Sequence, residues 1–460
     1  MMFRGTIKGI HFVGIGGIGM SGIAEVLLTQ GFTVTGSDLK EGAAVKRLRK
    51  MGAEIFIGHR PENIGDADVV VRSTAVNVSN PEVSEALRRM VPVIRRAEML
   101  AELMRLKHGI AIAGTHGKTT ITSMLATCLA SGGLDPTIVI GGRLDSLGGT
   151  NARLGTGDYL VAEADESDGS FLYLSPAVAL VSNIDREHLD HHGTMDALKN
   201  TFLEFIRKVP FYGFAVLCID HPVVQAMVPD VGRRVVTYGF ARTAMYRPAN
   251  LVCNGLRSEF DLYRLDDCLG RIALGMPGRH NVANAVGAAA VAAELGMSFE
   301  QIAQALDGFT GIQRRFTVRG EKNGVIVVDD YGHHPVEIEA TLSAAEDAYP
   351  NSRIVAVFQP HRYSRVHDLY DAFCAAFNRA GHVVVCPVYG AGEVPIEGVN
   401  SMQISEDMRR RGHRGVVGVA SLDEAREHIL EIAEEGDLVI TLGAGHVNSI
   451  CEPLLQQLGG

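Results

Sequence analysis

Short apolar runs alternate along the chain with longer segments of helical periodicity. Near the N-terminus, an apolar strand at residues 9–13 precedes a glycine-rich turn and a helix from about Met20 to Gln30. Further strands are predicted at residues 33–36, 54–57 and 68–71. Because strands that alternate with helices favour a parallel sheet, the first part of the chain is predicted to form an α/β domain.

The same alternation starts again near His108 and near Glu321. After Phe211 the pattern changes toward alternating polar and apolar residues, and it then returns to helix at residues 281–295 and 299–306. The remaining strands are expected at residues 137–140, 158–163, 178–182, 325–328, 353–358, 382–386, 415–418 and 438–442. We therefore predict an α/β protein of three domains, at residues 1–107, 108–320 and 321–460.

Length and composition agree with several domains and restrict the kind of partner. A chain of 460 residues is too long for one hydrophobic core, and a net charge of −10 argues against nucleic acid as the main ligand. No apolar stretch reaches the roughly 18 residues of a membrane span. The seven cysteines form no CxxC pair, so the pattern favours neither disulfides nor zinc, and a reducing cytoplasm is expected.

Residues 110–120 read IAIAGTHGKTT, an apolar run followed by a glycine-rich turn and a helix start. Backbone N–H groups of such a loop can surround phosphate oxygens, Lys118 can reach the β- and γ-phosphates, and the Thr119 hydroxyl can ligate magnesium. Ile112 stands where the strict pattern has glycine, which leaves a tight strand-to-helix turn as the alternative. The residues expected around the triphosphate of ATP are Gly114, Thr115, His116, Gly117, Lys118, Thr119 and Thr120.

A second glycine pattern, GxGxxG, lies at residues 14–19 and is followed by Asp38. This is typical of a dinucleotide-binding unit, and alone it would indicate a nicotinamide-dependent oxidoreductase. Glycines also let a helix N-terminus approach any other pyrophosphate, including that of a UDP-sugar. Tight packing of strand on helix is the alternative. Two such loops in successive domains favour an ATP-driven reaction on a nucleotide sugar, held by Gly14, Gly16, Gly17, Gly19 and Asp38.

A carboxylate-rich segment follows the strand predicted at 158–163. Glu163 ends that strand and is the residue we expect to bind magnesium or to position water. A solvated acidic turn is the alternative, and it is expected for some of Asp165, Glu166 and Asp168.

His188 follows the strand at 178–182, with acidic neighbours that can orient an imidazole toward a metal. The spacing matches no established zinc pattern. His191 and His192 are expected to be exposed loop residues.

Taken together, the motifs resemble the Mur ligases of peptidoglycan synthesis. The resemblance spans the whole chain and rests on GTHGKTT, EADESD, PGRHN at 277–281, RRF at 314–316, DDYGHHP at 329–335 and FQPHRYSR at 358–365. It implies a Rossmann-like N-terminal domain for the UDP-sugar, a central P-loop ATPase-type domain and a Rossmann-like C-terminal domain for the amino acid. It also implies ATP-dependent ligation of L-alanine to the lactyl carboxylate of UDP-N-acetylmuramate, in the bacterial cytoplasm.

The resemblance further assigns roles to individual residues. It places Lys118 on the ATP phosphates, and makes Thr119, Glu163 and His188 ligands of Mg²⁺ or Mn²⁺. The residues expected at the adenine are His280 and Asn281, Arg315 is expected at the phosphates, and the alanine pocket is assigned to Tyr331, His333, Arg362 and Arg365.

The chemistry agrees with these residue types. A carboxylate must be activated, here as an acyl phosphate, before an amine can attack it, and phosphoryl transfer needs positioned positive charge. His188 and His333 are the candidate bases for the amine proton. Arg362 and Arg365, three apart in a predicted helix, are expected on one face as a clamp for the alanine carboxylate.

Two alternatives stay open. One is a related ligase that attaches a tripeptide to the same sugar during wall recycling, whose members tend to lack the tyrosine at position 331. The other is a nicotinamide-dependent dehydrogenase with a regulatory ATP site.

Overall fold

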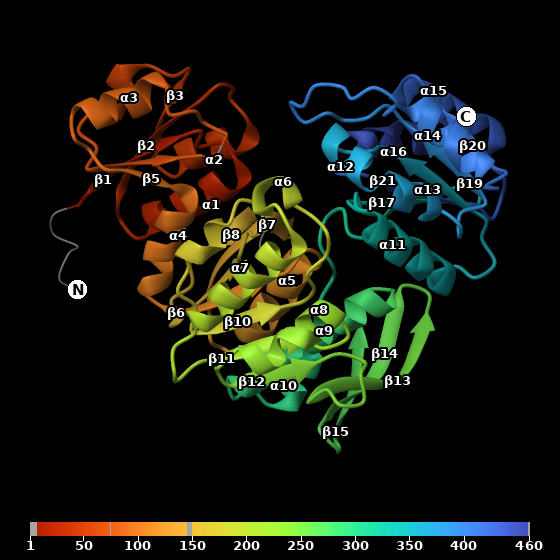
Figure 1. The fold of residues 1–460 in the computed structure, drawn as a ribbon, viewed down its shortest axis with the longest axis horizontal. Coiled ribbons are helices and arrows are strands. Elements are labelled where there is room, and N and C mark those ends of the chain that lie inside the picture. Colours follow the sequence, from red (N-terminus) through yellow and green to blue (C-terminus); the bar gives the residue numbers. More distant parts are fainter. Residues whose placement is uncertain (1–6, 74, 145–149, 459–460) are drawn as a thin grey trace. The chain divides into compact units, whose positions relative to one another are not determined.

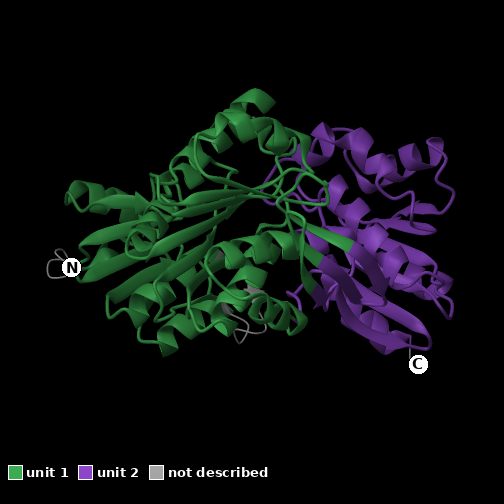
Figure 2. Cartoon of the chain, turned by 90° about the horizontal axis from the view of Figure 1, so that it is seen from below, with its two compact units in different colours: residues 1–249, 262–270, 284–309 green, residues 250–261, 271–283, 310–460 purple. Residues whose placement is uncertain are grey.

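Three β-sheets organise the chain in the computed structural model, which describes residues 7–73, 75–144 and 150–458 (Figure 1). Residue contacts group the chain into two units, which Figure 2 shows in green and purple. The first comprises residues 1–249, 262–270 and 284–309, and the second comprises residues 250–261, 271–283 and 310–460.

The first sheet has five parallel strands in the order β3-β2-β1-β4-β5. Its strands are β1 (Gly9–Val13), β2 (Thr33–Asp38), β3 (Glu54–Ile57), β4 (Val69–Arg72) and β5 (Val93–Arg95). Its helices are α1 (Ile18–Thr29), α2 (Ala43–Lys50), α3 (Pro81–Arg88) and α4 (Arg96–Arg105), with a 3₁₀ turn η1 (Pro61–Ile64). Phe12 packs with residues of α1, α2 and α4, whereas Val13 and Val70 pack with α3, so helices cover both faces. This order reverses direction at β1, where α/β sheets bind nucleotides.

The second sheet has ten strands in the order β15-β14-β13-β12-β11-β10-β6-β9-β7-β8. They are β6 (His108–Ala113), β7 (Thr137–Leu144), β8 (Thr150–Arg153), β9 (Tyr159–Glu163), β10 (Val178–Val181), β11 (Phe214–Cys218), β12 (Val235–Tyr238), β13 (Tyr246–Asn254), β14 (Arg257–Arg264) and β15 (Asp267–Leu274). The central strands β9, β6, β10 and β11 are parallel. Every residue of β10 is buried, as expected for a parallel strand covered on both faces.

Helices and short turns connect these strands. They are α5 (Lys118–Ser131), η3 (Ser170–Tyr173), α6 (Leu189–His192), α7 (Met195–Arg207), α8 (Pro222–Met227), η4 (Val228–Asp230), α9 (Arg279–Glu294) and α10 (Phe299–Asp307). Helix α10 begins with a capping box in which the Ser298 hydroxyl accepts from the backbone N–H of Gln301.

The third sheet has the order β16-β17-β21-β18-β19-β20 and is parallel except for the edge strand β16. Its strands are β16 (Thr317–Lys322), β17 (Val325–Asp330), β18 (Ile354–Phe358), β19 (His382–Val385), β20 (Val416–Gly418) and β21 (Leu438–Leu442). Its helices are α11 (Pro335–Ala348), α12 (Tyr363–Asp368), α13 (Tyr370–Ala375), α14 (Ser401–Arg410), α15 (Leu422–Ile432) and α16 (Cys451–Gln457), with η5 (Val447–Ile450). Phe358 packs with α11, α13 and α14, and Val357 packs with α15 and α16, so this sheet also has helices on both faces.

The α/β class and the succession of three sheets are confirmed, while the boundaries at 107 and 320 stay predictions. None of the helices in the described part of the chain is long and apolar enough to cross a membrane. All seven cysteines are free thiols in the structure.

Candidate active site

The loop between β6 and α5 has the shape of a phosphate-binding loop. Gly114 and Gly117 adopt φ angles of 132° and 85°, which side chains rarely tolerate. A Cβ on Gly114 would lie 2.2 Å from the Ser182 hydroxyl, and one on Gly117 would lie 2.6 Å from Oδ1 of Asn284. Both positions therefore require glycine for reasons of backbone angle and of space.

Neighbouring segments hold this loop in place. The backbone N–H of His116 donates to Oδ1 of Asn183 at 2.7 Å, and the Ser182 hydroxyl donates to the His116 carbonyl at 2.7 Å. The Thr115 hydroxyl accepts from the backbone N–H of Asp185 at 2.9 Å. The segment that follows β10 thus holds the loop in place through side-chain and backbone hydrogen bonds.

Asp185 also joins two histidines of this region. Its carboxylate lies 3.0 Å from Nε2 of His116 and 3.2 Å from Nε2 of His221. Burial raises the pKa of Asp185, but the two imidazoles beside it outweigh burial and leave that pKa well below its usual range. Asp185 is therefore ionised at neutral pH.

Lys118, the first residue of α5, forms a buried ion pair with Glu166. Its Nζ lies 2.8 and 2.9 Å from the two Glu166 oxygens and also donates to the Gly114 carbonyl. Burial lowers the pKa of Lys118, but the Glu166 carboxylate, with Asp165 and Glu163 nearby, gives a net rise. Lys118, the cation that we expect at the phosphates, is therefore neutralised in the free protein by the Glu166 carboxylate.

This pair corrects one expectation. Glu166 does not belong to a solvated turn, because it is only 2% exposed. Asp165 and Asp168 are half-buried and accept from the backbone N–H groups of Ser167 and Ser170. His192 is not a loop residue either, since it lies in α6 and its Nε2 is bonded to the Glu166 carbonyl at 2.8 Å.

The residues predicted to hold magnesium lie around this loop. Thr119 follows Lys118 in α5, Glu163 ends β9, and His188 caps α6 with a left-handed φ of 59°. Among the described residues, no group of three or more His, Cys, Asp or Glu side chains converges as a complete metal site. A hydroxyl with one carboxylate still fits Mg²⁺, which takes one or two protein ligands together with phosphate oxygens and water.

The glycine loop after β1 lines a cavity of about 620 Å³, here called the glycine-loop cavity. Asp38 accepts from the backbone N–H of Gly16 at 2.8 Å and so fixes the loop. Gly19 lies instead in the first turn of α1, where a Cβ would lie 3.0 Å from Cδ of Arg96. The residues around the cavity are Gly14, Gly16, Gly17, Asp38, Leu39, Lys40, Gly42, His59, Ser73, Ala75, Val76, Asn77, Ser79 and Asn80.

The residues predicted for the alanine pocket meet at the carboxyl edge of the third sheet. The rings of Tyr331 and His333 lie 5.3 Å apart, and His361 lies 5.7 Å from His333. Nη1 of Arg365 lies 3.1 Å from Nδ1 of His361. Burial, with His333 and the arginines Arg365 and Arg362, lowers the pKa of His361 to about 4, so its imidazole is neutral at pH 7.

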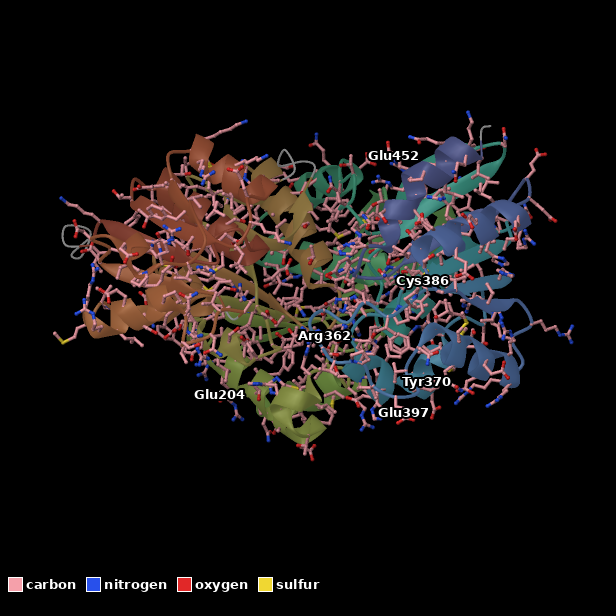
Figure 3. The ribbon with its side chains drawn as sticks, turned by 90° about the horizontal axis from the view of Figure 1, so that it is seen from above. Glu204, Arg362, Tyr370, Cys386, Glu397 and Glu452 are labelled. Carbon is pink, nitrogen blue, oxygen red and sulfur yellow. The ribbon has the colours of Figure 1, made fainter. Side chains whose placement is uncertain are left out.

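Arg362, labelled in Figure 3, corrects a second expectation. It precedes α12 with a φ of 66° and is not part of a helix, so it shares no helical face with Arg365. Its backbone N–H donates to the Tyr389 carbonyl at 2.9 Å, which holds the loop after β18 against the loop after β19.

The residues predicted at the adenine and phosphates have other partners in the described chain. The Asn281 side chain, which is buried, donates to the Pro277 carbonyl at 2.8 Å. Burial lowers the pKa of His280 despite the charge of Asp330 nearby. The Arg315 guanidinium lies 5.3 Å from the centre of the Tyr331 ring.

Several residues of these sites were missed by sequence reasoning. Asn284 touches the phosphate loop, Arg96 lies 3.6 Å from Asp165, and the Arg314 guanidinium lies 4.9 Å from the Tyr331 ring. His361 and Tyr389 stack with their ring centres 5.5 Å apart. His361 and Arg314 stand inside quoted motifs, so the sequence contained a signal for them, while Asn284 and Tyr389 carried none.

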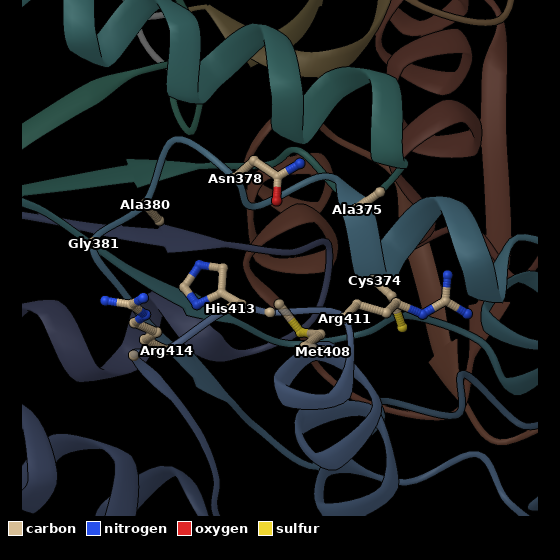
Figure 4. A pocket seen from close by; sticks show the side chains of 11 residues that line it. Cys374, Ala375, Asn378, Ala380, Gly381, Met408, Arg411, His413 and Arg414 are labelled. Atoms are coloured by element: carbon tan, nitrogen blue, oxygen red, sulfur yellow. The ribbon is translucent and has the colours of Figure 1, made fainter.

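A second cavity, of about 500 Å³, lies in the C-terminal region between α13, α14 and β19 (Figure 4). Its wall includes Cys374, Met408, Arg411, His413 and Arg414. None of the residues predicted for the alanine pocket lines it.

Two glycine loops of the nucleotide-binding type and a third sheet edge rich in histidine and arginine are typical of an α/β enzyme that acts on nucleotides. Models of the Mur ligase family, catalytic domain, the Mur ligase middle domain and the Mur ligase, glutamate ligase domain match residues 9–108, 112–292 and 314–445. The chain belongs to the Mur ligase family.

Individual relatives are similar in sequence to this chain over almost its full length. The UDP-N-acetylmuramate--L-alanine ligase of Syntrophotalea carbinolica is 55% identical over 454 residues, which cover 99% of both chains. The corresponding Anaeromyxobacter dehalogenans protein is 54% identical over 457 residues, again 99% of both.

Among solved structures, the UDP-N-acetylmuramate-alanine ligase of Thermotoga maritima superimposes with a TM-score of 0.81 at 30% identity, covering 98% of both chains. A murein peptide ligase of Psychrobacter arcticus gives 0.72 at 25% identity, covering 98% of this chain and 99% of that one.

Proposed function

We propose that this chain joins L-alanine to the lactyl carboxylate of UDP-N-acetylmuramate with the conversion of ATP to ADP and phosphate, as a step of peptidoglycan precursor synthesis in the cytoplasm. The observation that carries this proposal is the similarity over 99% of both chains to ligases with that printed name. The glycine-loop cavity and the Lys118 loop support the proposal, because both are glycine-rich loops at strand ends of the kind that bind phosphates. Membership in a ligase family removes the support for a dehydrogenase.

In the first step, a carboxylate oxygen of the sugar attacks the γ-phosphorus of ATP, ADP leaves, and an acyl phosphate remains. Lys118 neutralises the phosphate charge after it leaves Glu166, and the backbone N–H groups of Gly114 to Gly117 orient the phosphates. Thr119, Glu163 and His188 would hold Mg²⁺, which neutralises charge on the transferred phosphoryl group when bound.

In the second step, the neutral amine of L-alanine attacks the acyl carbon, the C–O bond to phosphate breaks, and an amide forms. Arg362 and Arg365 bind the alanine carboxylate, and Tyr331 limits the space for its side chain. His333 accepts the amine proton, or His188 if Thr119 and Glu163 alone hold Mg²⁺.

Phosphate release tests this proposal. The enzyme is given ATP, Mg²⁺ and UDP-N-acetylmuramate, and the rate is measured with L-alanine, glycine, L-serine and the wall tripeptide in turn. L-Alanine is expected to give the highest kcat/KM. A higher value with the tripeptide would favour the recycling ligase, for which the similarity to the Psychrobacter arcticus protein is the specific support.

A further inference from the structure

A buried carboxylate lies beside the wall of the glycine-loop cavity. Glu82, in the first turn of α3, has no exposed surface. Its Oε1 accepts from Nδ2 of Asn63 at 2.5 Å and from the backbone N–H of Arg60 at 3.3 Å, while its Oε2 accepts from the Ser37 hydroxyl at 2.5 Å. Burial raises the pKa of Glu82, but hydrogen bonds from His11, Ser37 and Asn63 outweigh burial and lower that pKa to about 2. Glu82 is therefore ionised at neutral pH and can only accept hydrogen bonds.

The charge of Glu82 fixes the direction of the next hydrogen bond. A serine hydroxyl has one proton, and Ser37 donates it to Glu82. Nδ1 of His59 lies 2.9 Å from the Ser37 oxygen, so this nitrogen must be the donor and must carry a proton. A neutral His59 consequently has a free lone pair on Nε2.

This second nitrogen belongs to a side chain that lines the cavity. His59 is one of the lining residues, and among the described residues Nε2 has no hydrogen-bond partner. Phosphate oxygens offer only lone pairs, so they do not match an accepting nitrogen. A ribose hydroxyl or the N3–H of uracil does match it.

We propose that Glu82 and Ser37 are positioning residues that hold the proton on Nδ1 of His59, so that Nε2 accepts a hydrogen bond from an O–H or N–H donor of the uridine group. This inference rests on the proposed function, because it takes the occupant of the cavity to be a UDP-sugar. The lone pair on Nε2 of His59 makes the cavity selective for a ligand with an O–H or N–H donor beside this nitrogen, independently of any contact to the phosphates.

Glu82→Gln tests the relay because the structure dictates how the amide must lie. Two groups that can only donate, Nδ2 of Asn63 and the backbone N–H of Arg60, meet at the Oε1 position. The groups at the Oε2 position are the Ser37 hydroxyl and the imidazoles of His11 and His59, and each of these can reverse its role. The amide oxygen therefore belongs at the Oε1 position, and the NH₂ group faces Ser37. The amide then donates to Ser37, Ser37 donates to Nδ1 of His59, and the proton of the imidazole moves to Nε2. Glu85→Gln is the matched control, because Glu85 lies on the same helix but pairs with Arg88 and Arg89.

The tautomer is measured directly on the full-length enzyme without ligand. Long-range ¹H–¹⁵N spectra of ¹⁵N-histidine-labelled protein distinguish the two forms, and His59→Gln assigns the signal. The expected result is an Nδ1–H tautomer in the parent and in Glu85→Gln, and an Nε2–H tautomer in Glu82→Gln. An Nε2–H tautomer in the parent would overturn the proposal.

Affinity gives the second readout. The dissociation constant for UDP-N-acetylmuramate is expected to rise about tenfold in Glu82→Gln, the loss of one hydrogen bond, with no change in the KM for ATP. A reversed tautomer with unchanged affinity would show that His59 does not touch the ligand and would refute the proposed contact. Failure of the parent to bind the UDP-sugar would instead refute the proposed function, whatever the tautomer.

A ligand-side experiment keeps the contact testable even if Glu82→Gln does not fold. The parent and His59→Phe are titrated with UDP, 2′-deoxy-UDP, 3′-deoxy-UDP and N3-methyl-UDP. One analogue is expected to bind the parent about tenfold more weakly than UDP and to lose nothing further in His59→Phe. Equal binding of all four by the parent, or equal losses in both proteins, would overturn the contact.

Discussion

Glu166→Gln should tighten the binding of metal-free ADP and ATP. In the free enzyme Nζ of Lys118 is held at 2.8 and 2.9 Å from the two Glu166 oxygens. If Lys118 binds the nucleotide phosphates as we propose, the phosphates must displace this carboxylate. A glutamine keeps the shape and one acceptor but removes the charge. The competition for Lys118 should therefore weaken.

The expected magnitude follows from the kind of bond that is lost. Lys118 stays charged, so its bond to a glutamine oxygen falls from the upper to the lower part of the about 1.5–3 kcal/mol range of hydrogen bonds to charged groups, and the competing term falls by about 1–1.5 kcal/mol. The dissociation constants for ADP and ATP should fall roughly five- to tenfold. Since Glu166 is only 2% exposed, salt should reduce this gain little.

Isothermal titration with ADP in the presence of a chelator, at low and high salt, measures the effect. Asp168→Asn is the matched control, because it removes one negative charge from the same segment. The Asp168 carboxylate accepts a hydrogen bond from the backbone N–H of Ser170 and is not bonded to Lys118. An equal gain in both variants would mean that only long-range charge matters. Weaker or unchanged binding in Glu166→Gln would refute the competition for Lys118.

Three further predictions concern the proposed sites. Lys118→Ala should lower ATP-dependent turnover by on the order of 10³-fold, with an unchanged dissociation constant for the UDP-sugar, and near-normal turnover would contradict the assignment of the ATP site. Glu163→Gln and His188→Asn should each raise the Mg²⁺ concentration for half-maximal rate, with Mn²⁺ rescuing the histidine variant better, and an unchanged metal dependence in both would exclude them as ligands. Arg362→Ala should raise the KM for L-alanine about 30- to 1000-fold with little effect on the KM for ATP, and Tyr331→Ala should mainly admit larger amino acids. Calorimetry on enzyme saturated with an ATP analogue tests the Arg362 and Tyr331 variants. Normal L-alanine binding by Arg362→Ala would show that the alanine pocket lies elsewhere.

The sequence predicted the strands well where they are buried on both faces. The strand expected at residues 178–182 is β10, and the one expected at 438–442 is β21. Both lie in parallel sheets, whose continuous apolar runs are strong local signals. The glycine-rich turn between β6 and α5 was predictable for a similar reason, because its glycines and lysine are neighbours in sequence.

Contacts between distant segments were not predictable in this way. Glu166 has three acidic neighbours within EADESD and so resembles a solvated turn, but Lys118, 48 residues earlier, covers and neutralises it. The left-handed Arg362 was expected in a helix because its own residue type gives no sign of its φ of 66°. Tyr389 stacks on His361 because the parallel strands β18 and β19 end at the same edge of the sheet. This pairing of strands cannot be predicted from the residues of either segment alone.

The bracing of the phosphate loop by Ser182, Asn183 and Asp185 bears on the order in which substrates can enter. A loop whose shape is already set by β10 does not have to be assembled by the sugar or the amino acid, so little ordering entropy opposes the arrival of the nucleotide. If this loop holds ATP as we propose, ATP can then enter the empty enzyme first. In a rapid-mixing experiment this would be seen as nucleotide binding at the same rate with and without the other two substrates.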